Sequence, residues 1–371
     1  MRKAHKSFAI LLVILLLCTG CMKPIRINNR AIIEGIGIDI ADGEYMLTLQ
    51  IFSSDGGGSQ TAVDVGKTNS LIVKTKGKSI AQAIDAAALK QGKQIFYGQN
   101  KIIVLSREAA RAGLSEVLAF FGANLKSRPN IDLIMANGSA GEILTAKISE
   151  GVMPALAIKN MLDNSDINGT ILRGDIMHAA AARQNGVTGC YMPVAAKTLD
   201  DNDDEGIELL GTAIFSGGRL AGVATHSETR GILWLRDEIG ETQMLVSTAD
   251  GEKMSLGVDN AKTQVSVELR SGVPHFKANI KVKSHVVEKM ELSGDRQSQI
   301  AVLQAAQSAV INEECQAALR LCLKGYSADV FKFANLLEKH EPQWYKENRT
   351  NYSTLLPKFT YEIAVRAEIT S

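Results

Sequence analysis

The residue whose setting most clearly indicates a chemical modification is Cys21. It follows a short basic region, an apolar run over residues 8–17, and the small residues Thr19 and Gly20. A basic start, about ten apolar residues and a small-residue site before a cysteine are typical of a bacterial lipoprotein signal. We therefore expect residues 1–20 to be a signal peptide and the thiol of Cys21 to carry a diacylglyceryl group. A plain secretory signal is the alternative.

The apolar run also bears on how the chain meets a membrane. It is too short to cross the roughly 30 Å hydrocarbon core as a lasting helix, and no other segment has the roughly eighteen consecutive apolar residues that a crossing requires. Two or three acyl chains hold a protein on a bilayer far longer than one chain does. The sequence thus predicts a protein that is lipid-anchored to the outer face of a membrane and does not cross it.

Other residues that could bind nucleotides do not form a complete pattern. Gly66-Lys67-Thr68 matches the end of a phosphate-binding loop, but the glycine that such a loop requires at position 61 is Thr61. A dinucleotide-type pattern begins at Gly35 and Gly37 and fails at Ile40, where its third glycine belongs. We therefore predict no nucleotide cofactor.

Histidines, serines and cysteines give no catalytic or metal-binding pattern either. The histidines after the signal are widely spread, at His178, His226, His275, His285 and His340. No His-Glu-x-x-His spacing and no Gly-x-Ser-x-Gly elbow occurs. We predict no catalytic residue, no metal and no cofactor, and we expect a protein that is not an enzyme.

After Cys21 the chain holds only Cys190, Cys315 and Cys322. An odd number of thiols gives no disulfide framework. Cys315 and Cys322 lie seven residues apart in one predicted helix, which separates their Cα atoms by about 10 Å and puts them beyond disulfide reach. All three are expected to be buried as small hydrophobic residues.

Net charge bears on the kind of partner, and length bears on the number of domains. Removal of residues 1–20 takes away three positive charges and changes the net charge from +1 to −2. That balance offers no general attraction to nucleic acid. The remaining length suits two or three domains with real cores.

Residues 21–199 are predicted to form an N-terminal domain of α/β type. Alternating apolar residues on either side of Asp42-Gly43 predict a hairpin. Ser79 is a candidate N-cap for a helix, and Ser139 with Glu142 has the capping-box spacing of another. Further strands are predicted at 70–74, 101–105 and 131–136.

Residues 200–260 are predicted to form a small middle domain. The acidic run over residues 200–205 lacks the glycine and spacing of a calcium loop and is expected to be a solvated linker or hairpin tip. Two short strands then flank the turn Ser216-Gly217-Gly218, and a short helix holds Arg230 and Trp234.

Residues 261–371 are predicted to form a C-terminal α+β domain. Period-two alternation predicts antiparallel strands around 265–269 and 276–282 and a closing strand at 359–369. A long helix is expected over about 297–323, followed by a second helix capped by Ser327 and ending before Pro342. The fold class is therefore α+β in three domains, with mixed and antiparallel sheets, helices packed on them, and a C-terminal antiparallel sheet carrying the long helix.

Four stretches, taken in order, resemble the C-subunit lipoproteins of spore germinant receptors, the GerA-type C family. They are Gly35–Asp39; Gly77–Ile84 with Gly98–Val104; Gly211–Phe215 with Glu228–Leu235; and Tyr326–Phe331 with Trp344. That family also carries a lipoprotein signal, so the resemblance covers nearly the whole chain. Where many members have Trp and Asp after the lipidated cysteine, this chain has Met22 and Lys23.

The resemblance implies a three-domain α+β lipoprotein on the outer face of the spore inner membrane. Such a protein acts with two membrane-embedded subunits to detect small nutrients and start germination, and the family assigns it no catalytic residue and no cofactor. Within the matching stretches, Gly98 and Gly231 are expected to permit turns and Trp234 to be packed. Arg230 is a candidate partner contact, since its charge must end at solvent or at a paired acid.

Two other classes remain open. A solute-binding lipoprotein of a transporter shares the anchor but should have two doubly wound lobes, which the antiparallel alternation after residue 263 disfavours. An extracytoplasmic lipoprotein enzyme would need a convergent site of perturbed side chains.

Overall fold

The fold was analysed in a computed structural model that describes residues 30–52, 70–123, 130–148, 151–164, 169, 171–199, 203–248, 251–287 and 296–370. The signal peptide, Cys21 and the Gly66-Lys67-Thr68 stretch lie outside the described residues. Predictions about them are therefore neither supported nor opposed by the fold.

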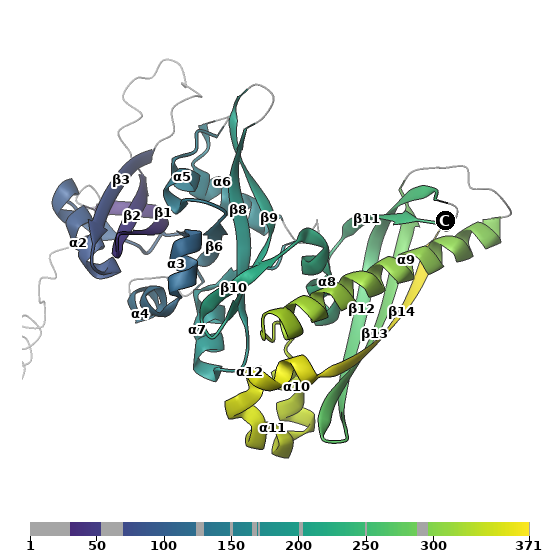
Figure 1. Cartoon of the computed structure of the whole chain (residues 1–371). Coiled ribbons are helices and arrows are strands. Elements are labelled where there is room, and N and C mark those ends of the chain that lie inside the picture. Colours follow the sequence, from purple (N-terminus) through teal and green to yellow (C-terminus); the bar gives the residue numbers. More distant parts are fainter. Residues whose placement is uncertain are drawn as a thin grey trace, which may run out of the picture.

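A ten-stranded mixed sheet forms the first half of the molecule (Figure 1). Its main order is β10-β9-β8-β6-β5-β1-β2-β3, with β4 beside β1 and β7 beside β6. The strands are β1 (Arg30–Ala41), β2 (Glu44–Phe52), β3 (Ser70–Gly77), β4 (Gln94–Phe96), β5 (Ile102–Leu105), β6 (Asp132–Ala136), β7 (Gly174–Asp175), β8 (Cys190–Leu199), β9 (Glu205–Ser216) and β10 (Arg219–Ala224).

Helices cover both faces of this sheet. The helices are α2 (Ile80–Gln91), α3 (Arg107–Ala112), α4 (Ser115–Ala123), α5 (Ala140–Thr145), α6 (Pro154–Asp163) and α7 (Ile176–Asn185). Apolar residues of α2, α3, α4 and α7 share one core with the sheet, and those of α5 and α6 share another on the opposite face. Every residue of β5 is buried, as expected of a central strand with parallel neighbours on both sides.

The predicted β1–β2 hairpin is confirmed, with Ala41 opposite Glu44 and the turn residues Asp42 and Gly43 at positive φ. The helix predicted after Ser79 is also confirmed, since the Ser79 side chain accepts a hydrogen bond from the Gln82 N–H.

The start of α5 differs from the predicted capping box. Ser139 accepts from the Gly141 N–H at 3.1 Å, but the carboxylate at this helix start belongs to Asp39 of β1 and not to Glu142. Asp39 accepts from the N–H groups of Ala140 and Gly141 at 2.9 Å each. An anion at a helix N-terminus satisfies N–H groups that have no partner within the helix. Asp39, at the end of the Gly35–Asp39 stretch, therefore binds the start of α5 to strand β1 of the sheet.

A four-stranded sheet forms the second half, in the order β11-β12-β13-β14. Its strands are β11 (Thr242–Ser247), β12 (Lys253–Arg270), β13 (Val273–Val286) and β14 (Thr360–Thr370). The associated helices are α8 (His226–Arg236), α9 (Arg296–Leu319), the π-helix η4 (Arg320–Gly325), α10 (Phe333–His340), α11 (Pro342–Asn348), α12 (Tyr352–Leu355), and the 3₁₀ turns η5 (Arg349–Asn351) and η6 (Leu356–Lys358). The long helix α9 lies across one face, as predicted (Figure 1).

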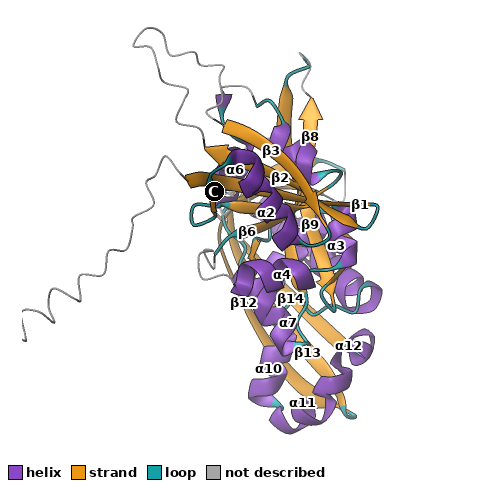
Figure 2. Ribbon diagram, turned by 90° about the vertical axis from the view of Figure 1, so that its left-hand side faces the viewer, coloured by secondary structure: helices purple, strands orange, loops and turns teal. Residues whose placement is uncertain are grey.

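One strand pairing in this sheet differs from the prediction. β14 runs parallel to β13, so the C-terminal sheet is antiparallel only from β11 to β13. The reason is the connection: α9 carries the chain back along the sheet, and α10 to α12 lie together at the lower end of the molecule (Figures 1 and 2). β14 therefore starts at the same end as β13 and runs in the same direction.

The two sheets divide residues 200–260 between them. Within this range β9 and β10 belong to the ten-stranded sheet, β11 and the start of β12 belong to the four-stranded sheet, and α8 lies between them. The division into three domains stays a prediction. The fold class, α+β with helices packed on two sheets, is confirmed.

Candidate functional site

The segment Tyr326–Lys332 joins the two halves of the molecule. The N–H of Gly189, the residue directly before β8, donates to the carbonyl of Asp329 at 2.8 Å, and the hydroxyl of Ser216 at the end of β9 donates to the carbonyl of Ser327 at 3.0 Å. From α8, the Arg236 guanidinium donates to the carbonyl of Val330 at 2.6 Å. This junction segment includes the whole Tyr326–Phe331 stretch that carries the family resemblance.

The buried side chain of Asp329 accepts several hydrogen bonds within the junction segment and from the residues that follow it. Its carboxylate, 1% exposed, accepts from the N–H groups of Phe331, Phe333 and Ala334 at 3.0, 3.2 and 2.7 Å and from the Tyr352 hydroxyl at 2.9 Å. Burial raises the pKa of Asp329, and these four hydrogen bonds oppose that rise. The carboxylate therefore holds the start of α10.

The predicted cap for this second helix was Ser327, and that prediction is wrong. Ser327 has a φ of 48° and lies six residues before the helix, while Lys332, the residue directly before α10, has a φ of 65°. Two non-glycine residues in the left-handed region five positions apart, directly after a π-helix, form a strained segment. Strain of this kind persists only where the surrounding contacts enforce it.

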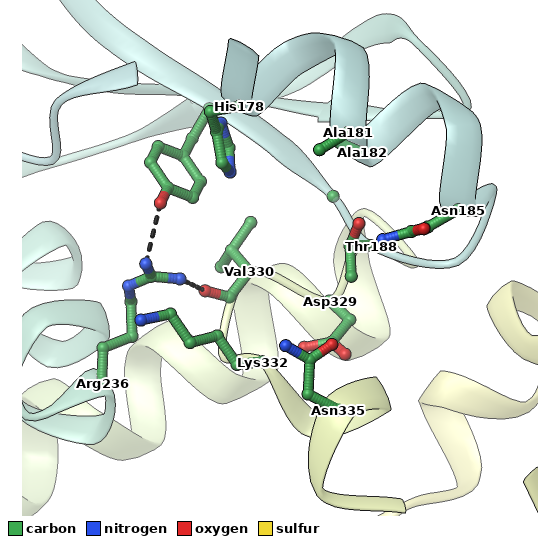
Figure 3. Close-up of a pocket in the computed structure, with 12 residues that line it drawn as sticks. His178, Ala181, Ala182, Asn185, Thr188, Arg236, Asp329, Val330, Lys332 and Asn335 are labelled. Carbon is green, nitrogen blue, oxygen red and sulfur yellow. Dashed lines mark hydrogen bonds between the residues drawn. The ribbon is translucent and has the colours of Figure 1, made fainter. Parts of the chain in front are cut away.

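A pocket of about 180 Å³ opens beside the junction segment (Figure 3). One wall comes from α7 and the start of β8, and the other comes from the end of α8, the junction segment and α10. Its lining residues are His178, Ala181, Ala182, Asn185, Thr188, Gly189, Tyr191, Arg236, Asp329, Val330, Lys332 and Asn335. We refer to it as the junction pocket.

The charged groups at one end of the junction pocket are bound to one another. Arg236 donates to the Tyr191 hydroxyl at 2.8 Å and to both oxygens of Glu238 at 2.7 and 2.9 Å. Lys332 donates to the same carboxylate at 2.6 Å. Burial by itself would raise the pKa of Glu238, but the hydrogen bonds from Arg236 and Lys332 outweigh it and lower the pKa. Glu238 is thus a shared acceptor for both cations.

His178 and Tyr191 form the aromatic part of the junction pocket. Their ring centroids lie 4.0 Å apart, and His178 Nδ1 is buried without a hydrogen-bond partner. Burial, aided by the charge of Arg236, lowers the pKa of His178 to about 4. Burial raises the pKa of Tyr191 to about 12. Both groups are therefore neutral at neutral pH.

Arg230, the candidate partner contact, lies in α8 and faces α9. Its guanidinium pairs with the carboxylate of Glu314, which is 3% exposed, and the Trp234 indole N–H donates to the other oxygen of that carboxylate at 3.0 Å. The charge of Arg230 thus ends at a paired acid within the chain. Its role in contacting a partner subunit stays a prediction.

Trp234 is fully buried, which confirms the expectation that it is packed. Gly231 differs from its prediction, since it lies within α8 and not in a turn. A Cβ at Gly231 would stand 2.1 Å from the carbonyl oxygen of Glu314, so the missing side chain lets α8 and α9 approach closely. The Glu228–Leu235 stretch is therefore a helix-packing motif.

The three cysteines within the described residues are buried and unpaired, as predicted. Burial raises the pKa of Cys190 to about 12 and also raises the pKa values of Cys315 and Cys322. Such thiols are poor nucleophiles.

Within the described ranges, no three histidine, cysteine, aspartate or glutamate side chains are placed to hold a metal ion. None of the helices described is both long and apolar enough to span a membrane.

The sequence did not predict the junction pocket, because its walls come from separate segments of the chain, residues 178–191 on one side and Arg236 with residues 329–335 on the other. In the sequence, the Tyr326–Phe331 stretch carries the family resemblance, and its Asp329 stands between the apolar residues Ala328 and Val330.

Two family descriptions match the chain. "Spore germination protein N-terminal domain" matches residues 24–196, and "Spore germination B3/GerAC like, C-terminal" matches residues 210–371. Since these ranges cover most of the sequence, the chain belongs to the GerAC family of spore germination proteins. The resemblance to the C subunits of GerA-type receptors is confirmed.

Individual relatives agree with this assignment. Spore germination protein KC of Bacillus subtilis (strain 168) is 22% identical over 393 aligned residues, which cover 99% of this chain and 95% of that protein. The putative spore germination protein YfkR of the same strain is 20% identical over 328 residues, covering 85% and 83%. The crystal structure of the GerBC protein has the same fold, with a TM-score of 0.61, 17% identity, and coverage of 91% of this chain and 97% of that one.

Proposed function

We propose that this chain is the lipid-anchored C subunit of a nutrient germinant receptor and works without catalysis, together with membrane-embedded subunits, to trigger spore germination. The observation that carries the proposal is the family match along nearly the whole chain. The two-sheet fold shared with the GerBC protein supports it.

The anchor in this proposal is Cys21. The basic, apolar and small-residue regions before it converge on a single cleavage point. Acyl chains on Cys21 would hold the folded chain at the outer face of the cell or spore inner membrane, where membrane-embedded subunits are within reach.

Replacing Cys21 tests the anchor. We expect Cys21→Ala to release the protein from membranes or to leave an uncleaved precursor, and to impair germination in response to nutrients. Cys190→Ala is the matched control, because its thiol is buried and unpaired. Cleavage of the Cys21 variant at the same point, with wild-type fractionation into membranes, would contradict this assignment.

A further inference from the structure

The end of the ten-stranded sheet where β1 begins lies close to the anchor proposed at Cys21. Nine residue steps separate Cys21 from Arg30, so even a fully extended chain keeps Arg30 within about 32 Å of the acylated cysteine. At this same end β4 pairs with the first residues of β1, β2 ends, β3 begins, and α2 ends just before β4. Figure 1 shows α2 and β1 to β3 at the end of the molecule away from the four-stranded sheet.

Large apolar side chains are exposed at this end. Leu89, in the last turn of α2, is 86% exposed, more than any other large hydrophobic residue in the described part of the chain, and Phe52 and Leu71 are each 44% exposed. Phe52 lies opposite Ser70 in the β2–β3 pairing, so Phe52 and Leu71 point to opposite faces of the sheet. The apolar side chains therefore surround the end of the sheet. Exposed apolar groups that gather in one place mark protein or membrane contacts.

The charges beside these apolar groups are positive. The sequence has no acidic residue between Asp85 and Glu108, and Lys90 and Lys93 are both exposed. Lys90 donates to the carbonyl of Lys74 at 2.8 Å, which leaves its charge without a negative partner. Within the described ranges Lys93 forms no ion pair.

Arg30 adds a third cation at the start of β1. Its guanidinium lies over the ring of Phe96, 5.1 Å from the centroid, and its Nε is buried without a hydrogen-bond partner. Cations interleaved with exposed apolar and aromatic groups suit the headgroup region of a bilayer, where the stem of a lysine lies against apolar groups and its ammonium stays in water. We define the entry surface by six residues: Arg30, Phe52, Leu71, Leu89, Lys90 and Lys93.

We propose that the entry surface rests on a bilayer with anionic headgroups, as a second membrane contact beside the acyl chains of Cys21. Leu89 would enter the boundary between headgroups and hydrocarbon, and Lys90 and Lys93 would lie at the lipid phosphates. The anchor holds this end of the sheet at the bilayer, whereas no feature of the described residues holds a protein partner there. This inference rests on the proposed anchor and adds an orientation to it, with the strands of the first sheet end-on to the membrane.

Tryptophan quenching by bromine-labelled lipids tests the contact on the full acylated chain reconstituted in vesicles. Leu89→Trp places a reporter on the entry surface, and Leu245→Trp is the matched control, because Leu245 is 56% exposed on β11 of the other sheet. In vesicles with about one third phosphatidylglycerol, quenching of the added fluorescence should be at least about twofold stronger at position 89 than at position 245. Vesicles of phosphatidylcholine alone should give a smaller difference.

Charge reversal tests the part played by the lysines. Lys90→Glu together with Lys93→Glu should reduce the quenching at position 89 by about half, as should about 0.5 M NaCl. Lys324→Glu together with Lys339→Glu is the control, since both lysines are exposed in the second half of the molecule. It should leave the quenching unchanged.

Equal quenching at positions 89 and 245, or no dependence on phosphatidylglycerol, overturns the proposal. It is also overturned if position 89 stays unquenched while the Lys90 and Lys93 reversal removes partner subunits from the purified complex, because the surface then belongs to a protein partner. Mass spectrometry of the reconstituted protein separates this inference from the anchor. Absence of acyl chains overturns both, and equal quenching of an acylated chain overturns the membrane contact alone.

Discussion

Glu314 shows how one buried carboxylate can fix the packing of two helices. It accepts from Arg230 and from the Trp234 indole, both on α8, while it is carried by α9. Buried charges are tolerated when they are paired and fully hydrogen-bonded. Arg230 was singled out from the sequence because its charge needed a partner, but its partner lies 84 positions away in the chain.

We predict that Arg230→Ala lowers the free energy of unfolding by about 3 kcal/mol, because it leaves Glu314 buried without its main charge partner. Arg320→Ala is the control, since Arg320 is exposed and has one long hydrogen bond to Gln316, at 3.4 Å. Its effect should be below about 0.5 kcal/mol. Urea unfolding checks both. Equal stability of the two variants would contradict a structural role for the pair.

His178 predicts a pH dependence of stability. Its pKa in the fold is about 4, below the ordinary value of 6.5, so the neutral ring contributes stability that is full above pH 6.5 and is lost as the pH falls toward 4. Between pH 7 and pH 5 this loss should be about 2 kcal/mol. The raised pKa of Asp329 acts in the opposite sense.

The comparison that isolates His178 is between wild type and His178→Phe, which keeps a ring against Tyr191. Urea unfolding at pH 7 and pH 5 should show that the variant loses about 2 kcal/mol less than wild type over this range. If both proteins lose the same amount, His178 does not titrate as the structure indicates.

Among the helices and strands, turns and helix caps formed by neighbouring residues were predicted from the sequence, whereas a cap supplied by a distant segment was not. Ser79 caps the helix that directly follows it, and the Asp42-Gly43 turn closes its own hairpin. The carboxylate at the start of α5 comes from Asp39, about 100 positions away. No periodicity contains such information, because it depends on which segments become neighbours. The acceptor at the start of α10, Asp329, is close in sequence, four positions before Phe333, but the left-handed residue Lys332 separates it from the helix.

Asp329 and Ser327 provide a paired test of the junction. We predict that Asp329→Ala lowers the free energy of unfolding by at least about 3 kcal/mol, because three buried N–H groups and the Tyr352 hydroxyl lose their acceptor. Ser327→Ala should cost less than about 1 kcal/mol, because the Ser327 hydroxyl caps no helix and the carbonyl that accepts from Ser216 is kept. Thermal or urea unfolding checks both variants. A larger effect for Ser327 would restore it as the cap of α10.

At the scale of the whole molecule, the alternation of apolar and polar residues predicted where the strands lie but not which strands pair with one another. The closing strand was expected from its period of two, yet its parallel pairing follows from the path through α9 to α12. Likewise β9 and β10 complete the first sheet although they follow the acidic run. The junction pocket depends on this same long-range assembly, which is why no candidate residue of it was predicted.

Removal of residues 357–371 tests the second half of the molecule. β14 pairs with β13 along its length, and Phe359 packs against Phe276. Burial of such side chains contributes roughly 1.5–3 kcal/mol each, so the truncated chain should lose cooperative unfolding of residues 260 onward. Replacing Glu362 and Glu368, exposed on β14, by Ala is the control and should leave the transition nearly unchanged. Cooperative unfolding of the truncated chain near the wild-type temperature would contradict the prediction.

The central claim, that the chain is a receptor subunit, is tested most directly by recovering its partners. The tagged full-length protein would be purified in mild detergent from the spore membranes of the organism that encodes it, with the tagged Cys21→Ala variant in parallel, and the proteins that accompany each would be identified by mass spectrometry. We predict that wild type brings down membrane-embedded germinant receptor subunits and that the variant brings down far less of them. Recovery of wild type without any such subunit, or with the components of a transporter, would contradict the proposed function.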